Sequence, residues 1–143
     1  MTARVRDIRQ AFGAERMTAQ RETLARVAGA MGGAFTIDDL AAEVRKREIT
    51  LGLATVYRGV AALERTGWLE RVGERDGSAL FARCRAGGHH HHLICTGCGR
   101  IEAADCPLEE IVGPAESATG FVVTGHEITL YGLCPDCASA QRD

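Results

Sequence analysis

Four cysteines are arranged in two Cys-x-x-Cys pairs, Cys95-Thr-Gly-Cys98 and Cys134-Pro-Asp-Cys137, separated by 35 residues. Each pair can present two thiolates on one tight turn, and two pairs complete the tetrahedral sulfur shell that Zn²⁺ prefers in structural sites. A single pair could be a thioredoxin-type redox motif, but the strand and helix expected around such a motif are missing. The spacing therefore predicts one closed zinc site formed by all four cysteines.

A run of four histidines, residues 89–92, ends three residues before Cys95. If the run is extended, alternate side chains point to opposite faces. His90 and His92 then share one side, and His89 and His91 share the other. Imidazoles paired in this way are candidate metal ligands on both faces of the strand.

Further candidate ligands lie elsewhere in the chain. Cys84 is near His90 and His92 in sequence and could join that pair. Glu109 and His126 could face the other pair, but they lie too far along the chain for the sequence alone to connect them. His126 stands in an alternating apolar segment, where a lone histidine is more often a core residue than a ligand.

Cysteine and histidine divide the chain near residue 84. All six cysteines and all five histidines follow residue 83. Residues 1–83 hold 14 basic and 11 acidic side chains, a balance of +3, whereas residues 84–143 hold 3 and 8, a balance of −5. Such asymmetry is typical of one half that faces nucleic acid and another half with a different role, although +3 alone is weak support.

The first half predicts three short helices and a β-hairpin. Thr18 and Thr36 are good N-caps for the first two helices, and Gly67 ends the third. Asp76-Gly77 favours a hairpin turn. The expected elements are helices over about 18–31, 36–47 and 53–66, and strands over 68–72 and 78–84. This order describes a winged helix-turn-helix.

The third helix is expected to bury one apolar face, which comprises Leu53, Val56, Val60 and Leu63. Small residues on its other face would let it approach DNA closely, and Tyr57 and Arg58 could reach phosphates or base edges. Winged helices also mediate protein contacts, so the pattern favours DNA binding without requiring it.

The second half predicts a small α/β unit. Ile101-Glu102 is expected to end a short strand, Pro107 to start a helix that Pro114 shortens or kinks, and residues 121–133 to form a long strand. A sheet this small would have an exposed edge, which pairing with a second copy would cover. Dimerisation also suits a helix-turn-helix protein that contacts two half-sites.

Several motifs in this order resemble the ferric uptake regulator (Fur) family over residues 18–137, most of all its zinc uptake regulator (Zur) branch. The motifs are Arg16-Met-Thr18-Ala-Gln20-Arg21, Leu53-Ala-Thr-Val-Tyr57-Arg58, the histidine run with Cys95-x-x-Cys98-Gly99, and Cys134-x-x-Cys137. The resemblance implies a zinc-responsive homodimeric repressor that binds palindromic operator DNA when metal-loaded. The fold class expected for the chain is α+β. We expect a winged-helix DNA-binding domain over 1–84, a hinge at about 84–90, and a metal-binding dimerisation domain over 85–143.

The resemblance also implies site residues. The structural zinc would be bound by Cys95, Cys98, Cys134 and Cys137. A regulatory metal at the hinge would be bound by Glu70, Cys84, His90 and His92, with Glu70 where zinc sensors more usually have Asp. A second regulatory metal would be bound by His89, His91, Glu109 and His126. Cys106 matches nothing in the pattern and is interpreted as a small apolar residue. The expected DNA contacts are Arg16, Gln20, Thr55, Tyr57, Arg58 and Arg65.

Other function classes fit less of the sequence. A zinc deaminase would need a His-x-Glu motif, which is not present. A zinc-ribbon interaction module would explain the four cysteines but not the helices. A Fur-family regulator of iron, nickel or manganese stays open, although a hinge thiolate favours zinc. Residues 1–10 carry three arginines without an apolar segment behind them, so we expect no signal peptide. The expected location is therefore the cytoplasm. We expect neither a membrane nor a small organic substrate as a partner.

Overall fold

The computed structural model describes residues 8–83 and 89–142, except for the Glu109 side chain. The chain divides into two compact units, Met1–Cys84 and Arg85–Asp143. Both contain helices and strands, which confirms the mixed fold class. Within the described ranges, no helix has the length and apolar character that crossing a membrane requires.

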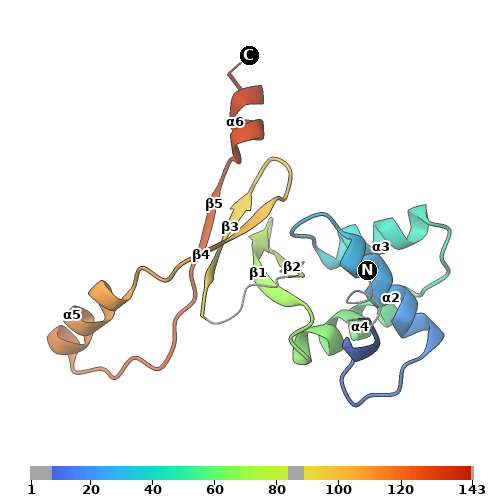
Figure 1. Cartoon of the computed structure of the whole chain (residues 1–143), viewed down its shortest axis with the longest axis horizontal. Coiled ribbons are helices and arrows are strands. Elements are labelled where there is room, and N and C mark those ends of the chain that lie inside the picture. The colour runs from blue at the N-terminus through green and yellow to red at the C-terminus, as the bar shows by residue number, and fades with distance from the viewer. Residues whose placement is uncertain (1–7, 84–88, 143) are drawn as a thin grey trace. The chain divides into compact units, whose positions relative to one another are not determined.

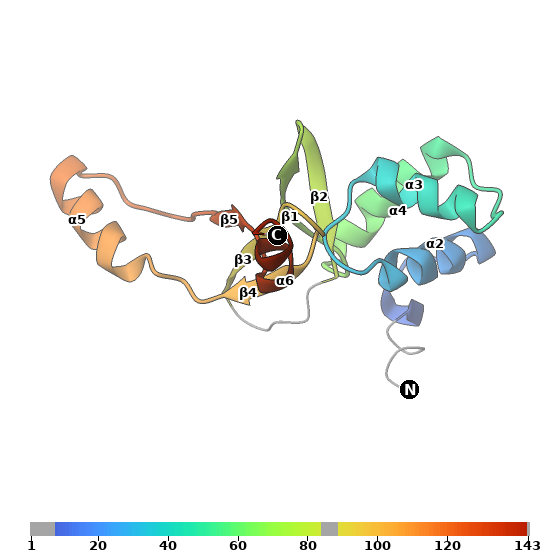
Figure 2. The same ribbon diagram turned by 90° about the horizontal axis from the view of Figure 1, so that it is seen from above.

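Three helices form the body of the N-terminal unit, namely α2 (Ala19–Ala30), α3 (Ile37–Lys46) and α4 (Leu53–Arg65) (Figures 1 and 2). Their starts are set by the predicted caps. The backbone N–H of Arg21 donates to Thr18 Oγ1 at 3.2 Å. Thr36 and Asp39 form a complete capping box, in which each backbone N–H donates to the side chain of the other.

The core of this unit lies where the three helices meet. Its fully buried side chains include Leu24, Leu40, Val60 and Leu63. The prediction that Leu53 is buried was wrong, because its side chain is 53% exposed. Leu53 is the first residue of α4, and the buried face of that helix begins one turn later.

The wing is a hairpin of β1 (Glu70–Arg75) and β2 (Ser78–Ala82), paired antiparallel. Asp76 and Gly77 form its turn with φ angles of 52° and 79°, as the sequence predicted. An isolated antiparallel bridge joins Phe81 of β2 to Phe35, directly before the N-cap of α3. The wing is thereby attached to the helices through a buried aromatic pair.

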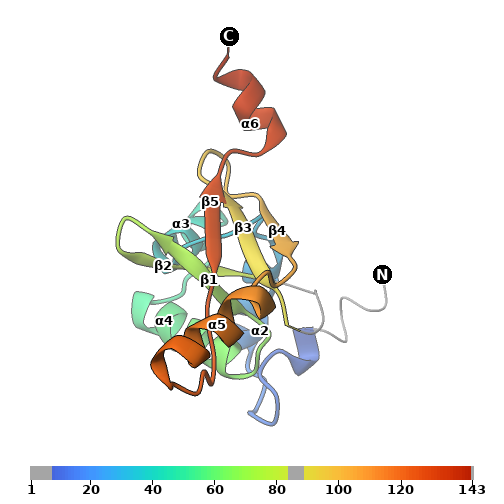
Figure 3. The same ribbon diagram turned by 90° about the vertical axis from the view of Figure 1, so that its left-hand side faces the viewer.

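The C-terminal unit is a three-stranded sheet with two helices. Its strands, in spatial order, are β4 (Ile101–Ala104), β3 (His91–Cys95) and β5 (Thr129–Gly132), with β3 antiparallel to β4 and parallel to β5. Helices α5 (Glu109–Thr119) and α6 (Pro135–Ala140) lie beyond opposite ends of this sheet (Figures 1 and 3). Several large apolar side chains of this unit are exposed, among them Phe121, Val122 and Leu130.

The first wing strand was predicted over 68–72 but spans Glu70–Arg75, and three boundaries of the C-terminal unit also differ from the sequence predictions. Residues 121–128 are not a strand, because no described segment of the same chain pairs with them; only Thr129–Gly132 pairs, with β3. Ile101 begins β4 rather than standing near its end. Helix α5 starts at Glu109, two residues after Pro107, and continues through Pro114.

Candidate metal centres

The two cysteine pairs meet at one end of the sheet. Cys95 ends β3, Cys98 lies in the following turn, and Cys134 and Cys137 flank the start of α6. All four Sγ atoms lie within 4.8 Å of one another, and those of Cys98 and Cys134 are 3.8 Å apart. Four Zn–S bonds of about 2.3 Å in a tetrahedron require sulfur separations of about 3.8 Å. The donor set and its geometry therefore fit a zinc ion.

Backbone amides favour thiolate at this site. The N–H of Cys134 donates to Cys95 Sγ at 3.3 Å. This amide, followed by that of Cys98, lowers the pKa of Cys95 to about 6. Hydrogen bonds shared with the other three sulfurs, first that of Cys134, raise the pKa of Cys137 to about 12. Without metal the four sulfurs must share protons, and a divalent cation would replace those protons.

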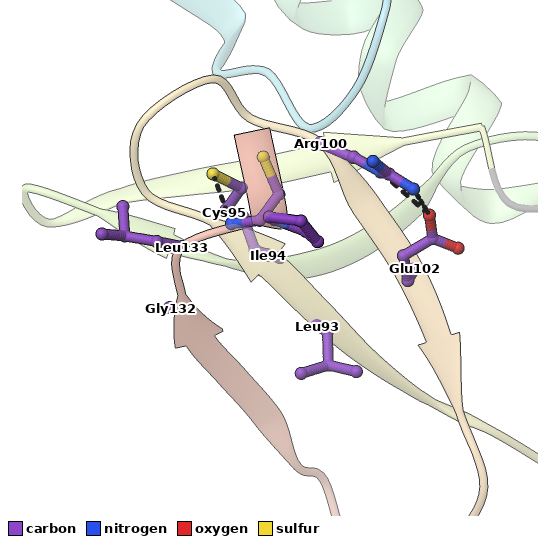
Figure 4. Close-up of a pocket in the computed structure, with 9 residues that line it drawn as sticks. Leu93, Ile94, Cys95, Arg100, Glu102, Gly132 and Leu133 are labelled. Carbon is purple, nitrogen blue, oxygen red and sulfur yellow. Dashed lines mark hydrogen bonds and ion pairs between the residues drawn. The ribbon is translucent and has the colours of Figure 1, made fainter. Parts of the chain in front are cut away.

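Close packing holds the two turns together. A Cβ atom on Gly97 would lie 3.0 Å from Cys137 Sγ and 3.2 Å from its Cβ, so a side chain there would push Cys137 away. Beside Cys95 lies a cavity of about 210 Å³. Figure 4 shows Arg100 at this cavity bonded to Glu102; the guanidinium donates to Glu102 Oε1 from Nε at 3.0 Å and from Nη2 at 2.8 Å.

A second group of ligand atoms forms on one side of the histidine run. His126 Nε2 lies 2.8 Å from Nε2 of His89 and 3.2 Å from Nε2 of His91. Cys106 Sγ lies 3.2 Å from the same His126 nitrogen. The four ligand atoms all lie within 4.8 Å of one another, and we call these residues the histidine cluster.

The histidine cluster contains three of the four predicted ligands, together with one residue that was not predicted. His89, His91 and His126 come together, and His126 is exposed rather than part of the core. The Glu109 side chain lies outside the described residues. Cys106, interpreted from the sequence as a small apolar residue, faces the three imidazoles instead. The only sequence signal for it was its place among the other cysteines and histidines.

His91 is the buried member of the histidine cluster. Burial, followed by the nearby imidazoles of His89 and His126, lowers the pKa of His91, and a hydrogen bond to the Ile128 backbone opposes this effect. The neutral imidazole, which is the metal-binding form, is favoured as a result.

The predicted hinge ligands are described only in part. The rings of His90 and His92 stand edge to face with centroids 4.9 Å apart, on the opposite side from His89 and His91, as alternation predicted. Glu70 begins β1 in the N-terminal unit. Cys84 lies outside the described residues, so this ligand set stays a prediction.

The expected DNA contacts lie on the surface of the N-terminal unit. On α4, Tyr57 is 48% exposed, and Arg58 is exposed with its Nη2 3.4 Å from Thr55 Oγ1. Arg65, in the last turn, pairs with Glu15 at 3.4 Å. Arg16 and Gln20 are also exposed, just before α2 and in its first turn. Their role as DNA contacts stays a prediction.

Comparison with known proteins identifies this arrangement. Residues 13–131 match the ferric uptake regulator family. The chain belongs to that family. Among curated relatives of this Fur-family chain, the ferric uptake regulation protein of Bordetella parapertussis is 37% identical over 72% of this chain and 74% of its own length. The zinc uptake regulation protein of Mycobacterium tuberculosis is 31% identical over 87% of this chain and 95% of its own.

Solved structures agree on the fold. A zinc uptake regulator complexed with zinc and DNA superposes with a TM-score of 0.72 and 25% identity, covering 99% of this chain and 95% of that one. Family membership makes this chain a metal-responsive transcription regulator with a winged-helix unit and a metal-binding α/β unit. The relatives are named for iron and for zinc, so their names do not decide which metal the chain senses.

Proposed function

We propose that the chain is a zinc-responsive transcriptional repressor that binds palindromic operator DNA as a metal-loaded homodimer and controls genes of zinc uptake and homeostasis. The observation that carries the proposal is the presence of two separate ligand clusters in the unit attached to a winged helix. One cluster is sulfur-only, and the other combines three imidazoles with one sulfur. Two clusters of different chemistry allow one metal to hold the fold and another to exchange with the cell.

The proposal assigns one structural zinc and one or two regulatory zinc ions to each protomer. Cys95, Cys98, Cys134 and Cys137 would hold the structural ion. Such an ion supplies folding energy to a small unit, because the ligands come together only in the folded chain. No bond of a substrate changes in this scheme, so the protein acts without being an enzyme, and we place it in the cytoplasm with the DNA.

The regulatory ligands at the hinge follow from the sequence and the family resemblance. Glu70 and Cys84 belong to the N-terminal half, whereas His90 and His92 begin the C-terminal half. Coordination by all four would tie the DNA-binding unit to the dimerisation unit. The metal-bound dimer would then favour the conformation in which the two DNA-binding helices are separated by the distance between adjacent major grooves. The size of this shift is set by how much more tightly the metal binds that conformation than the others.

Homodimer formation is supported by apolar surface on the C-terminal unit. Phe121 and Val122 are 75% and 82% exposed, and Leu130 and Tyr131 of β5 are about half exposed. Large apolar side chains left exposed on a folded unit are candidate contacts for a partner. A second copy of the chain is the partner that a two-fold symmetric operator requires.

Zinc is supported by the sulfur ligands in the chain and by two zinc-named relatives. Thiolate with imidazole suits zinc better than iron or manganese, which prefer nitrogen and oxygen ligands. The second candidate is a regulator of another metal, namely iron, which the ferric-named relatives favour, or nickel or manganese.

Selection of bound duplexes from a randomised DNA pool tests the proposal. Wild-type protein with structural zinc retained is mixed with the pool in the presence of added Zn²⁺, Fe²⁺, Mn²⁺ or Ni²⁺, or of a chelator. We expect enrichment of a two-fold symmetric sequence with Zn²⁺ at the lowest free concentration and none with chelator. Enrichment that does not depend on metal would overturn the regulatory proposal. Enrichment with Fe²⁺ alone would show that the sensed metal is iron rather than zinc.

A further inference from the structure

We propose that the thiolate of Cys106 is a ligand in the histidine cluster, where it completes a three-nitrogen, one-sulfur site selective for zinc. The inference rests on the proposed metal-sensing function and makes its second site specific. It departs from the ligand set that the family resemblance implies, in which Glu109 supplies the fourth ligand.

The distances within the histidine cluster match a small cation. With Zn–N bonds of about 2.0 Å and a Zn–S bond of about 2.3 Å, a tetrahedral site needs nitrogen separations of about 3.3 Å and nitrogen-to-sulfur separations of about 3.5 Å. The Nε2 atom of His126 lies 2.8 and 3.2 Å from the imidazole nitrogens and 3.2 Å from Cys106 Sγ. Shifts of about 0.5 Å or less would therefore bring these contacts to the required lengths.

The orientation of the side chains supports the same conclusion. The imidazoles of His89, His91 and His126 all turn Nε2 toward one point, although His126 comes from a separate segment. Imidazoles that converge in this way from separate segments are typical of metal-binding histidines.

The surroundings of Cys106 do not suit a buried apolar residue. Cys106 is only half-buried, and its sulfur contacts an exposed imidazole rather than a core side chain. It lines a cavity of about 660 Å³ together with His89 and His126, between α5 and residues 123–126. A metal held there would have access to solvent and could exchange.

A sulfur ligand changes which metal the site prefers. Three imidazoles with a carboxylate would form a nitrogen and oxygen site that iron and manganese also occupy. Replacing the carboxylate by a thiolate makes the site softer and favours zinc, or its spectroscopic substitute Co²⁺. Cys106 is thus a specificity-determining residue as well as a ligand.

Cobalt binding tests the proposal directly. The starting protein is full-length Cys84→Ser, which removes the other regulatory thiolate, chelated mildly so that elemental analysis still finds one zinc per protomer. On titration with Co²⁺ we expect a near-ultraviolet thiolate-to-cobalt absorption band. Adding Cys106→Ser should abolish the band and weaken cobalt binding at least ~10-fold, because even outer-shell changes typically cost 10–100-fold. Adding Glu109→Gln instead should preserve the band.

Each alternative outcome is distinct. A band that survives Cys106→Ser, or a cobalt affinity that only Glu109→Gln reduces, would overturn the thiolate ligand while leaving the sensor function intact. If the starting protein binds no Co²⁺ in addition to its retained zinc, and the protein with Cys84 intact binds none either, the proposed metal-sensing function itself fails. Cobalt-edge X-ray absorption of the starting protein shows whether sulfur lies at about 2.3 Å without any change at Cys106.

Discussion

The carboxylate of Asp39 lies 2.6 Å from Nη2 of Arg75, which joins helix α3 to the wing. The same Oδ2 atom accepts the backbone N–H of Thr36 at 3.0 Å, so one oxygen serves both the capping box and the ion pair. Burial by itself raises the pKa of Asp39, but the Thr36 amide and the Arg75 guanidinium outweigh it and lower that pKa below 3.8. The charged form therefore stabilises the wing attachment.

Asp39→Asn should reduce the free energy of unfolding by about 1 kcal/mol at neutral pH, the usual cost of weakening a cap and an exposed ion pair. A carboxyl whose pKa is lowered by folding contributes stability above its unfolded value of 3.8 and loses it as pH falls through the folded value. The difference from wild type should therefore shrink below about pH 4. Urea unfolding followed by the fluorescence of Trp68 measures this difference in the free energy of unfolding, because this buried residue is the only tryptophan in the sequence.

Asp38→Asn is the matched control for Asp39→Asn. Asp38 is the preceding residue in the first turn of α3 and is exposed, so its loss removes only a favourable interaction with the helix dipole, worth a few tenths of a kcal/mol. A difference between Asp39→Asn and wild type that stays constant from pH 7 to pH 3 would contradict the assigned role of the carboxylate.

Features set by neighbouring residues were predictable from the sequence. The caps at Thr18 and Thr36 and the turn at Asp76-Gly77 each depend on side chains within three residues, and all three were predicted correctly. Alternation along the histidine run correctly separated His90 and His92 from the other pair. The two Cys-x-x-Cys pairs are distant in the chain, but a closed zinc site needs both, and this chemistry correctly predicted that the four cysteines meet.

Features set by distant contacts were not predictable in the same way. Residues 121–128 alternate like a strand, but a strand needs a pairing partner, and the described chain supplies none there. Cys106 and His126 are 20 residues apart and meet only because α5 and the segment after it return the chain to the sheet. Neither spacing nor composition indicates such a contact.

Gly59→Ala should destabilise the N-terminal unit by about 1–3 kcal/mol, as overpacking of a core usually does. A Cβ atom at Gly59 of α4 would lie 2.0 Å from Cδ2 of Leu24, which is fully buried on α2. Either Leu24 must leave its rotamer or the two helices must separate. Urea unfolding followed by Trp68 fluorescence measures the loss, with Gly32→Ala as control because a Cβ there meets nothing within 4 Å. Equal midpoints for both variants would contradict the close helix approach.

Arg58→Ala should weaken operator binding by about 1–3 kcal/mol, or roughly 5–150-fold, if Arg58 reaches base edges or phosphates. Fluorescence anisotropy with the duplex enriched by selection, at fixed salt and zinc, gives the dissociation constants. Arg26→Ala is the control, since Arg26 is exposed on α2 and pairs with Glu22 at 2.6 Å. Unchanged affinity for Arg58→Ala, with Trp68 fluorescence unaltered, would remove Arg58 from the DNA interface.

Cys98→Ser should cost the protein its tightly held zinc, because three sulfurs no longer close the tetrahedral shell. We expect zinc retained after mild chelation to fall from one ion per protomer to nearly none, together with loss of ordered C-terminal structure by circular dichroism. Cys106→Ser should retain the ion under the same conditions, since Cys106 lies outside the four-cysteine group. Retention of a full equivalent by Cys98→Ser would show that the tight zinc is held elsewhere.

Val122→Glu should shift the protein from dimer to monomer. Val122 lies in the apolar segment after α5 and is 82% exposed in a single chain, which is the surface that we assign to the second copy. Burying a glutamate there without a partner would cost several kcal/mol, and so weaken association by more than ~100-fold. Sedimentation equilibrium over a range of protein concentrations measures this change. Ala118→Glu adds the same charge at an exposed position on α5 and should leave the dimer intact. A dimer that survives Val122→Glu with unchanged affinity would move the interface away from this segment.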